Sequence, residues 1–343
     1  TQGSEMKKHI VIAALSIGAL ALTGCGASGA AETNSTSDKS AEKLEPVTLV
    51  LGHAGSETDP RQIAAVQFKE LVEEKSDGQI TVEIHSASTL GTWEEMVEGL
   101  QLGSVDVVIE SLLAVESYTD LSGIETAPFL YEDEEQFFEV WEGDLGTEIK
   151  QAITEASGYE MLGNMYRGPR QLTTKEPVET LDQLKGKTIR TPSAPTMLAT
   201  WEALGARAEA LPFNEVYSAL ESGVLDGQEN PLDAILFNSI HEVAPYIGET
   251  SHMYANYHFI TWSEALTALP KEYQGIIRES SDEVGKTYTE DTIANTEDYR
   301  KQLEEAGAEF VEIKDLEKWV KATQPIIDGL PEQVQEWVEE VRG

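Results

Sequence analysis

Three side chains suited to binding an anion stand at the ends of segments that the sequence predicts to be extended: Arg170, Arg190 and Asn230. A guanidinium is a planar fork that meets a carboxylate with two parallel hydrogen bonds. Ligands of open α/β sheets bind at the carboxyl ends of strands, and the predicted strand 188–190 ends just before Pro192. We therefore expect the three side chains to close on an anion. Taken alone, each arginine could instead form a surface ion pair, because the chain carries 62 acidic residues and 24 lysines and arginines.

The sequence offers little for catalysis or metal binding. It has no Gly-x-Ser-x-Gly turn that would present a nucleophilic serine, and its single cysteine is Cys25. The later histidines His241, His252 and His258 lack the four-residue spacing that places two imidazoles on one helix face. We therefore expect no catalytic residue, no metal and no cofactor.

The elements that position the arginines begin with alternating strands and helices. The first three predicted strands are 47–53, 80–85 and 105–109. Between the second and third strands, Thr92 and Glu95 form a capping box at the start of a helix. This order predicts a parallel sheet covered by helices, with His53 and Glu110 at the ends of its strands.

The rest of the chain repeats this alternation and then changes character. Asn214 is predicted to cap a helix over 215–222. Residues 270–306 predict one long helix in which Gly285 is a possible break. A helix of that length could lie across two lobes.

Composition limits the class of partner. A chain of 343 residues with 40% hydrophobic residues is long enough for two lobes around a sizeable core. A formal net charge of −38 argues against nucleic acid and against an anionic membrane surface, because both require a basic footprint.

The first residues have the order of a secretory signal. A basic start at Lys7 and Lys8 precedes a short apolar run over 10–22, and the run ends at Cys25. Leu22-Thr23-Gly24-Cys25 resembles the lipobox of bacterial lipoproteins, which implies cleavage before Cys25 and acylation of its thiol. We assign 1–24 to the signal peptide, with Thr1 to Glu5 as extra residues, and 25–45 to the lipidated cysteine and a flexible tether. An uncleaved anchor or a buried cysteine is the alternative.

An ordered series of motifs resembles the solute-binding subunits of tripartite ATP-independent periplasmic (TRAP) transporters, the DctP-like family in its lipoprotein form. The motifs include Gly186-Lys187-Thr188-Ile189-Arg190-Thr191-Pro192, Leu211-Pro212-Phe213-Asn214-Glu215-Val216-Tyr217 and Asp226-Gly227-Gln228-Glu229-Asn230-Pro231. Shorter matches at Leu51-Gly52-His53, Leu90-Gly91 and Leu269-Pro270 extend the likeness over nearly the whole chain after the tether.

The resemblance implies an α/β, two-lobed fold like that of periplasmic binding proteins, with a central ligand cleft and a long lobe-spanning helix. Lobe I would comprise 46–167 and about 256–295, lobe II 168–255 and about 296–322, and a C-terminal helix 323–343. By the same resemblance, Arg190 would pair with a ligand carboxylate in two-pronged fashion. Arg170 would add a second cation, and Asn230 would reach the same carboxylate or an adjacent hydroxyl.

Other residues are expected to decide which acid binds. His53 and Glu110 could hydrogen-bond ligand hydroxyls, and Trp93 could pack on a sugar face. Phe213 is either an apolar wall of the cleft or a core residue, and His53 and Trp93 could also be packing residues. The Asp-Arg pair that sialic-acid-binding members carry near this loop is Trp93-Glu94 here, so sialic acid is disfavoured.

The resulting hypothesis is an extracytoplasmic, lipid-anchored and monomeric binding protein that captures an organic acid and hands it to the small and large TRAP membrane subunits. A hexuronate or aldonate is favoured over a C4-dicarboxylate or a keto acid. Two alternatives remain: a ligand-sensing partner of a receptor, and an enzyme on sugar acids with Glu110 as base and His53 as acid.

Overall fold

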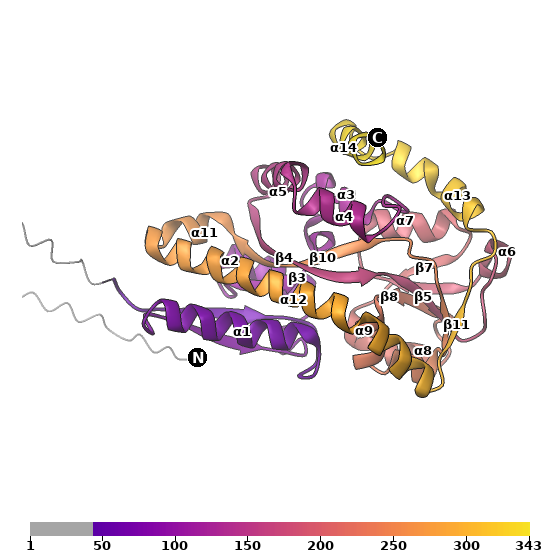
Figure 1. Cartoon of the computed structure of the whole chain (residues 1–343), viewed down its shortest axis with the longest axis horizontal. Coiled ribbons are helices and arrows are strands. Elements are labelled where there is room, and N and C mark those ends of the chain that lie inside the picture. Colours follow the sequence, from indigo (N-terminus) through magenta and orange to yellow (C-terminus); the bar gives the residue numbers. More distant parts are fainter. Residues whose placement is uncertain (1–43) are drawn as a thin grey trace, which may run out of the picture. The chain divides into compact units, whose positions relative to one another are not determined.

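Two β-sheets, each covered by helices on both faces, organise residues 44–343, the part of the chain that the computed structural model describes (Figure 1). The predicted signal peptide, Cys25 and the tether up to residue 43 lie outside the described residues. Leu44 packs on a hydrophobic cluster, and the Tyr273 hydroxyl donates to the Glu45 carbonyl at 3.1 Å. These last two residues of the predicted tether are therefore packed on the folded body.

The first sheet has the strand order β2-β1-β3-β10-β4. Its strands are β1 (Val47–Gly52), β2 (Ile80–His85), β3 (Val107–Glu110), β4 (Tyr159–Pro169) and β10 (Tyr254–Trp262). β1, β2 and β3 are parallel as predicted, but β10 runs antiparallel to both β3 and β4. The prediction of a parallel sheet was therefore wrong for this edge, because β10 is formed by a distant segment that returns from the other sheet.

The second sheet has the order β11-β9-β5-β8-β6-β7. Its strands are β5 (Gln171–Thr174), β6 (Thr188–Thr191), β7 (Arg207–Ala210), β8 (Gly227–Asn230), β9 (Tyr246–Gly248) and β11 (Glu309–Val311). Only Arg170 separates β4 from β5, and β9 is followed directly by β10, so the chain passes between the sheets at both places. A third crossing runs from β10 through two helices to β11. We call each sheet with its covering helices the first half and the second half.

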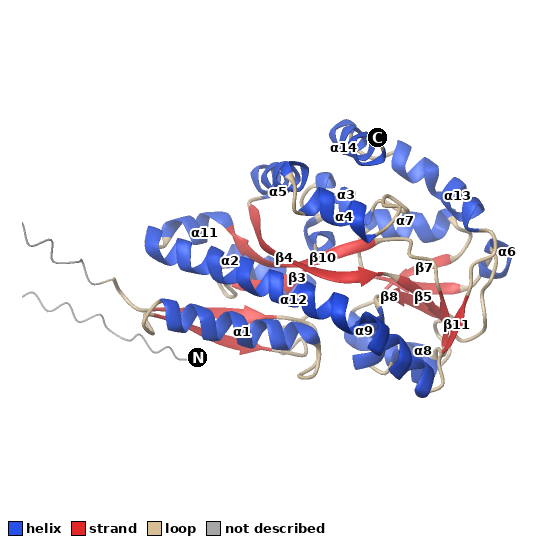
Figure 2. Cartoon of the chain, in the orientation of Figure 1, coloured by secondary structure: helices blue, strands red, loops and turns tan. Residues whose placement is uncertain are grey.

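Helices cover both faces of the first sheet (Figure 2). One face packs against α1 (Pro60–Lys75), α11 (Ser263–Ala268) and α12 (Lys271–Glu305). The other face packs against α2 (Trp93–Leu102), η1 (Leu112–Val115), η2 (Asp120–Ser122), α3 (Gly123–Thr126), α4 (Glu134–Trp141) and α5 (Asp144–Ser157). The predicted capping box is present at the start of α2: the Glu95 amide donates to Thr92 Oγ1 at 3.3 Å, and the Thr92 amide donates to Glu95 Oε2 at 2.7 Å.

The second half is covered in the same way. One face packs against α6 (Leu181–Leu184), α7 (Pro195–Ala203) and α13 (Leu316–Asp328), and the other against η3 (Phe213–Glu215), α8 (Val216–Glu221), α9 (Leu232–Phe237) and α10 (Ile240–Val243). Asn214 does not cap a helix as predicted. It lies inside the 3-10 turn η3, and no side-chain hydrogen bond caps α8.

The long helix predicted over 270–306 is confirmed as α12, 35 residues without a break at Gly285. It contacts β4 and α1 in the first half and α9 in the second half. Gly285 lies where a Cβ would meet the backbone nitrogen and oxygen of Asn164 at 2.8 Å, so its lack of a side chain permits close contact between α12 and β4. Gly285 therefore does not break the helix but allows α12 to pack closely on β4.

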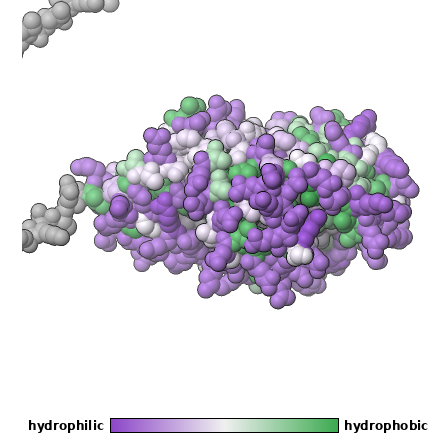
Figure 3. All heavy atoms as spheres, turned by 90° about the horizontal axis from the view of Figure 1, so that it is seen from above, coloured by the Kyte–Doolittle hydropathy of each residue, from purple (hydrophilic) through white to green (hydrophobic). Residues whose placement is uncertain are grey.

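The C-terminal segment forms two short helices, around Trp319 and Trp337, as the sequence predicts; the first of them begins before the segment 323–343 that was assigned to a C-terminal helix. α13 ends at Asp328, and α14 (Glu332–Arg342) begins after Pro331, which disfavours helical geometry in the residue before it. α13 packs on α7, whereas α14 packs on α3. The end of the chain therefore contacts both halves. No helix of the described residues combines the length and apolar character of a membrane span, and the face seen in Figure 3 is mostly hydrophilic.

Candidate ligand-binding site

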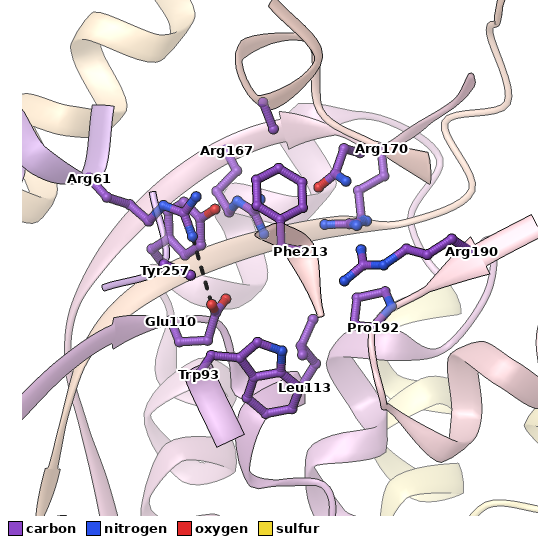
Figure 4. Close-up of a pocket in the computed structure, with 13 residues that line it drawn as sticks. Arg61, Trp93, Glu110, Leu113, Arg167, Arg170, Arg190, Pro192, Phe213 and Tyr257 are labelled. Carbon is purple, nitrogen blue, oxygen red and sulfur yellow. Dashed lines mark ion pairs between the residues drawn. The ribbon is translucent and has the colours of Figure 1, made fainter. Parts of the chain in front are cut away.

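A pocket of about 410 Å³, part of it open to solvent, lies between the two halves (Figure 4). The first half contributes Ala54, Arg61, Trp93, Glu110 and Leu113. The second half contributes Arg190, Pro192, Phe213, Asn230 and Ala234, and the crossing strands contribute Arg167, Arg170 and Tyr257. Six of the seven predicted ligand-binding residues therefore line one pocket, and His53 does not.

Arg190 is a buried cation without a carboxylate partner. It lies near the end of β6, which runs parallel to β7 and β8, and only 2% of its surface is exposed. Its Nε donates to the Leu211 carbonyl at 2.8 Å, and no carboxylate oxygen of residues 44–343 lies within 4.0 Å of its guanidinium nitrogens. Burial lowers the pKa of Arg190 to about 10, and Arg170 contributes to this shift. A buried cation in this state is stabilised by any anion that reaches it.

Arg170, by contrast, is already paired. Its Nε and Nη2 bind the two carboxylate oxygens of Glu229, the latter at 2.8 Å, and Nη2 also donates to the Glu229 carbonyl at 2.9 Å. Burial acts to raise the pKa of Glu229, but the adjacent Arg170 dominates and lowers it to about 2. The pair is therefore ionised, and Arg170 lines the pocket with its charge compensated.

Asn230 completes the same wall of the pocket. It is the last residue of β8 and lies opposite Gln171 in the antiparallel pairing of β8 with β5. Its Nδ2 donates to Gln228 Oε1, and Gln228 in turn donates to Thr173 Oγ1 at 2.7 Å. This chain of amides fixes the orientation of the Asn230 side chain, which lines the pocket together with the two arginines.

A second group of charges lies across the pocket. Arg61 binds Asp59 through Nε at 2.9 Å and Nη2 at 2.8 Å, and its Nη1 lies 3.8 Å from Glu110 Oε2. The Arg167 guanidinium carbon lies 3.7 Å from the centroid of the Tyr257 ring. The Nε of Arg167 is buried and has no hydrogen-bond partner among the described residues.

The electrostatic surroundings of these two arginines differ from those of Arg190. Burial acts to lower the pKa of Arg61, but Asp59 and other neighbours raise it well above its usual value. For Arg167 burial is likewise outweighed, by Tyr257, Asp233 and Glu110, so its pKa is raised. The cations on this side are compensated by the protein itself, whereas Arg190 is not.

Sequence reasoning did not single out Arg61 or Arg167. A signal existed for Arg61, which lies in the first turn of α1, where the helix dipole disfavours a cation. In so acidic a chain, an arginine at that position indicates a specific anionic partner. Arg167 is three residues before Arg170, but nothing in the sequence showed that β4 would turn it into the pocket.

Aromatic side chains form two walls. Trp93 is the first residue of α2 and is 6% exposed. Phe213 is half-buried, and its ring centroid lies 5.7 Å from the guanidinium carbon of Arg190 and 5.9 Å from that of Arg61. Phe213 also packs against the hydrophobic cluster around α8 and α9. It therefore contacts the core and faces the pocket at once.

His53 lies outside the pocket lining. It is fully buried, and its Nε2 lies 2.9 Å from Gln62 Oε1. Burial, with a smaller effect of Arg61, lowers the pKa of His53 to about 4, so the imidazole is neutral at pH 7. Its neighbour Ala54 lines the pocket in its place.

Comparison with known proteins identifies the family. A family model for bacterial extracellular solute-binding proteins, family 7, matches residues 51–334. The chain belongs to this family. The two-lobed α/β fold with its long helix matches solved TRAP periplasmic solute-binding proteins, which confirms the predicted fold class.

Three relatives of this solute-binding protein illustrate the range of ligands. Solute-binding protein RD1_1052 of Roseobacter denitrificans is 31% identical over 303 residues, 88% of this chain and 92% of that protein. The crystal structure of that protein with bound L-galactonate matches the fold of this chain with a TM-score of 0.82. The match covers 88% of this chain and 100% of that chain. The 2,3-diketo-L-gulonate-binding periplasmic protein YiaO of Escherichia coli is 29% identical over 301 residues, 87% of this chain and 88% of that protein. A TRAP solute-binding protein of Shewanella oneidensis, solved with bound succinate, is 25% identical, has a TM-score of 0.81 and covers 87% of this chain and 100% of that chain.

Proposed function

We propose that this protein captures a sugar acid, a hexuronate or an aldonate, outside the cytoplasm and delivers it to the membrane subunits of a TRAP transporter. The observation that carries this proposal is the contrast between Arg190 and the other pocket arginines. Arg190 is the pocket arginine whose pKa is lowered by burial, and it has no carboxylate partner among residues 44–343. One ligand carboxylate would supply the missing charge.

The opposite end of the pocket favours an uncharged, hydroxylated group. Arg61 and Arg167 have Asp59, Glu110 and Asp233 around them, so a second ligand carboxylate would meet compensated cations and the Glu110 carboxylate. Hydroxyls can both donate to Glu110 and accept from Arg167, whose Nε lacks a partner. This pattern favours a sugar acid over a C4-dicarboxylate.

The walls fit the same ligand. A pyranose or an extended polyol has apolar C–H faces, and Trp93 and Phe213 present rings on which such faces pack. Asn230 would hold either the carboxylate or the hydroxyl next to it. A simple keto acid would leave the buried Nε of Arg167 without a hydrogen-bond partner, at a cost of about 1–3 kcal/mol.

Delivery requires the small and large permease subunits, and we propose that Cys25 carries a lipid that keeps the protein beside them. On this proposal the protein acts as a monomer and releases its ligand unchanged. Closure of the halves around the acid would strengthen the ion pair with Arg190 by excluding water.

A thermal-shift screen tests the ligand class, because a ligand that binds only the folded state raises the melting temperature. The panel contains galactonate, glucuronate, galacturonate, succinate, malate and 2-oxoglutarate. We expect the largest shift with a sugar acid. Trp93→Ala should weaken that ligand about 10-fold or more, from the loss of ring packing. A larger shift with succinate or malate than with every sugar acid would refute the ligand class while leaving the Arg190 site intact.

Glu110→Gln separates the two ligand classes further. It removes the carboxylate that faces the hydroxylated end, so sugar acids should bind more weakly, whereas succinate should bind no worse. Glu98→Gln, an exposed change on α2, is the matched control for the loss of one negative charge. Equal effects of the two variants on sugar-acid affinity would contradict the role of Glu110.

A further inference from the structure

A hydrogen bond joins the two halves beside the pocket. Ser193 Oγ donates to Glu94 Oε1 at 2.7 Å. Glu94 follows Trp93 in the first turn of α2, and Ser193 follows Pro192 between β6 and α7. Trp93 and Pro192 both line the pocket (Figure 4). The bond between their neighbours therefore ties together two of its walls, one from each half.

A second bond holds the same segment a few residues further on. The Thr196 amide donates to Glu116 Oε1 at 2.7 Å, and Glu116 Oε2 accepts from Thr126 Oγ1 at 3.2 Å. Glu116 and Thr196 are both buried, and Met197 of α7 packs in the hydrophobic cluster of the first half. Residues 193–197 are therefore attached to the first half at a partly exposed point, Ser193, and at a buried one, Thr196.

Glu94 does more than accept this bond. Its Oε2 is buried and has no hydrogen-bond partner among the described residues. The carboxylate belongs to the first half, and its charge acts on Arg190 in the second half. Glu94 therefore favours contact between the two halves in two ways, through the Ser193 hydroxyl and through attraction to Arg190.

We propose that Glu94 and Ser193 form the latch of the cleft: they are positioning residues that set how long the ligand stays, without touching it. Glu94 does not line the pocket, so it makes no contact that selects one acid over another, and its loss should leave the order of preference among acids unchanged. Association begins with the halves apart, where the bond does not exist, whereas release requires the bond to break. The latch rests on the proposed function in that it gates the same pocket.

The test compares dissociation and association rates of the acid that gives the largest thermal shift, followed by stopped-flow tryptophan fluorescence. Ser193→Ala and Glu94→Gln should each raise the dissociation rate about 5- to 20-fold, from the loss or weakening of a charge-assisted hydrogen bond. The association rate should change less than about 2-fold, as it does when an interaction forms after encounter. Glu98→Gln, on the exposed side of the same helix, should change neither rate.

The double variant Ser193→Ala with Glu94→Ala should dissociate no faster than Glu94→Ala alone, because both changes remove one bond. The partly exposed latch is chosen over Glu116, whose loss would strand the buried Thr196 amide and threaten folding. A merely structural role would lower the melting temperature and leave the dissociation rate unchanged. Unchanged dissociation in both single variants would overturn the latch.

Failure of the proposed function would be visible separately. If no acid of the panel binds the wild type, hydrogen exchange at the backbone amides of Ala194, Thr196 and Met197 is measured without ligand. Ser193→Ala should then exchange faster there than Glu98→Gln, because the segment is released from the first half. Equal exchange in the two variants would overturn the latch whatever the ligand is.

Discussion

Arg170, immediately before β5, and Glu229 of the adjacent strand β8 form a buried, two-pronged ion pair. The same sheet places Arg190 next to them, since β8 pairs with β5 on one side and with β6 on the other. One carboxylate therefore compensates one of two neighbouring arginines and leaves the second without a carboxylate partner among residues 44–343. On the proposed function, Arg190 binds the ligand carboxylate and Arg170 helps to position it.

This division predicts opposite effects of one substitution on stability and on binding. Arg190→Met removes a buried, unpaired cation, so the ligand-free protein should become more stable by about 1–4 kcal/mol. The same change should abolish the thermal shift produced by the best acid. Chemical denaturation with and without ligand measures both quantities. Arg190→Lys, which keeps the charge but not the planar fork, should bind with intermediate affinity, and wild-type affinity in Arg190→Met would refute the site.

Arg170 should behave differently because its loss strands a buried carboxylate. Arg170→Met should destabilise the protein by about 3–5 kcal/mol, the cost of breaking a buried pair by removing one partner. Arg170→Met combined with Glu229→Gln should recover much of this loss, since no buried charge is left alone. Denaturant unfolding of the two single variants and the double variant measures the coupling. Strictly additive effects would show that the two side chains do not stabilise each other.

Two glycines on α12 provide a matched test of helix packing. Gly285→Ala would place a Cβ 2.8 Å from the backbone of Asn164 and should destabilise the protein by about 1–3 kcal/mol. Gly275→Ala on the same helix meets no atom within 4 Å and should stabilise it by about 0.5–1 kcal/mol, from helix propensity. Thermal unfolding of the two variants should therefore shift in opposite directions. If both variants shifted the melting temperature in the same direction, the close packing of α12 on β4 would be contradicted.

His53 predicts a pH dependence. Its pKa is lowered from 6.5 to about 4 in the folded protein, mainly by burial, so the unfolded chain binds more protons at this site between these values. The stabilisation it contributes is complete above pH 6.5 and is lost as the pH falls toward 4. Denaturant unfolding from pH 7.5 to 5 should show that the free energy of unfolding falls less in His53→Gln than in the wild type, by on the order of 2 kcal/mol. If the free energy of unfolding depended on pH in the same way in both proteins, the His53 imidazole would be solvated rather than buried.

Local sequence patterns were sufficient for much of the fold. The capping box of Thr92 and Glu95 and the long helix α12 follow from residue types at short spacings, because capping and amphipathic packing act within a few residues. The order of β1, β2 and β3 with their helices was likewise readable. Ordered motifs around Arg190 and Asn230 indicated the family and the binding of an acid.

Contacts between distant segments were not readable in this way. The antiparallel strand β10 brings Tyr257 beside Arg167, and α1 brings Arg61 to the same pocket, although nearly 200 residues separate Arg61 from Tyr257. His53 fell outside the pocket because its ring bonds to Gln62, which only the packing of α1 on the first sheet determines.

The sequence by itself therefore predicted an arginine–amide group suited to an acid, because those residues lie in short motifs at strand ends. Only the tertiary structure decided which arginine is free. That outcome depends on where Glu229, Asp59 and Glu110 lie, and in a chain with 62 acidic residues the spacing along the sequence does not say which carboxylate reaches which cation. Charge compensation is a property of distances in space, and those distances are set when the two sheets fold against their helices.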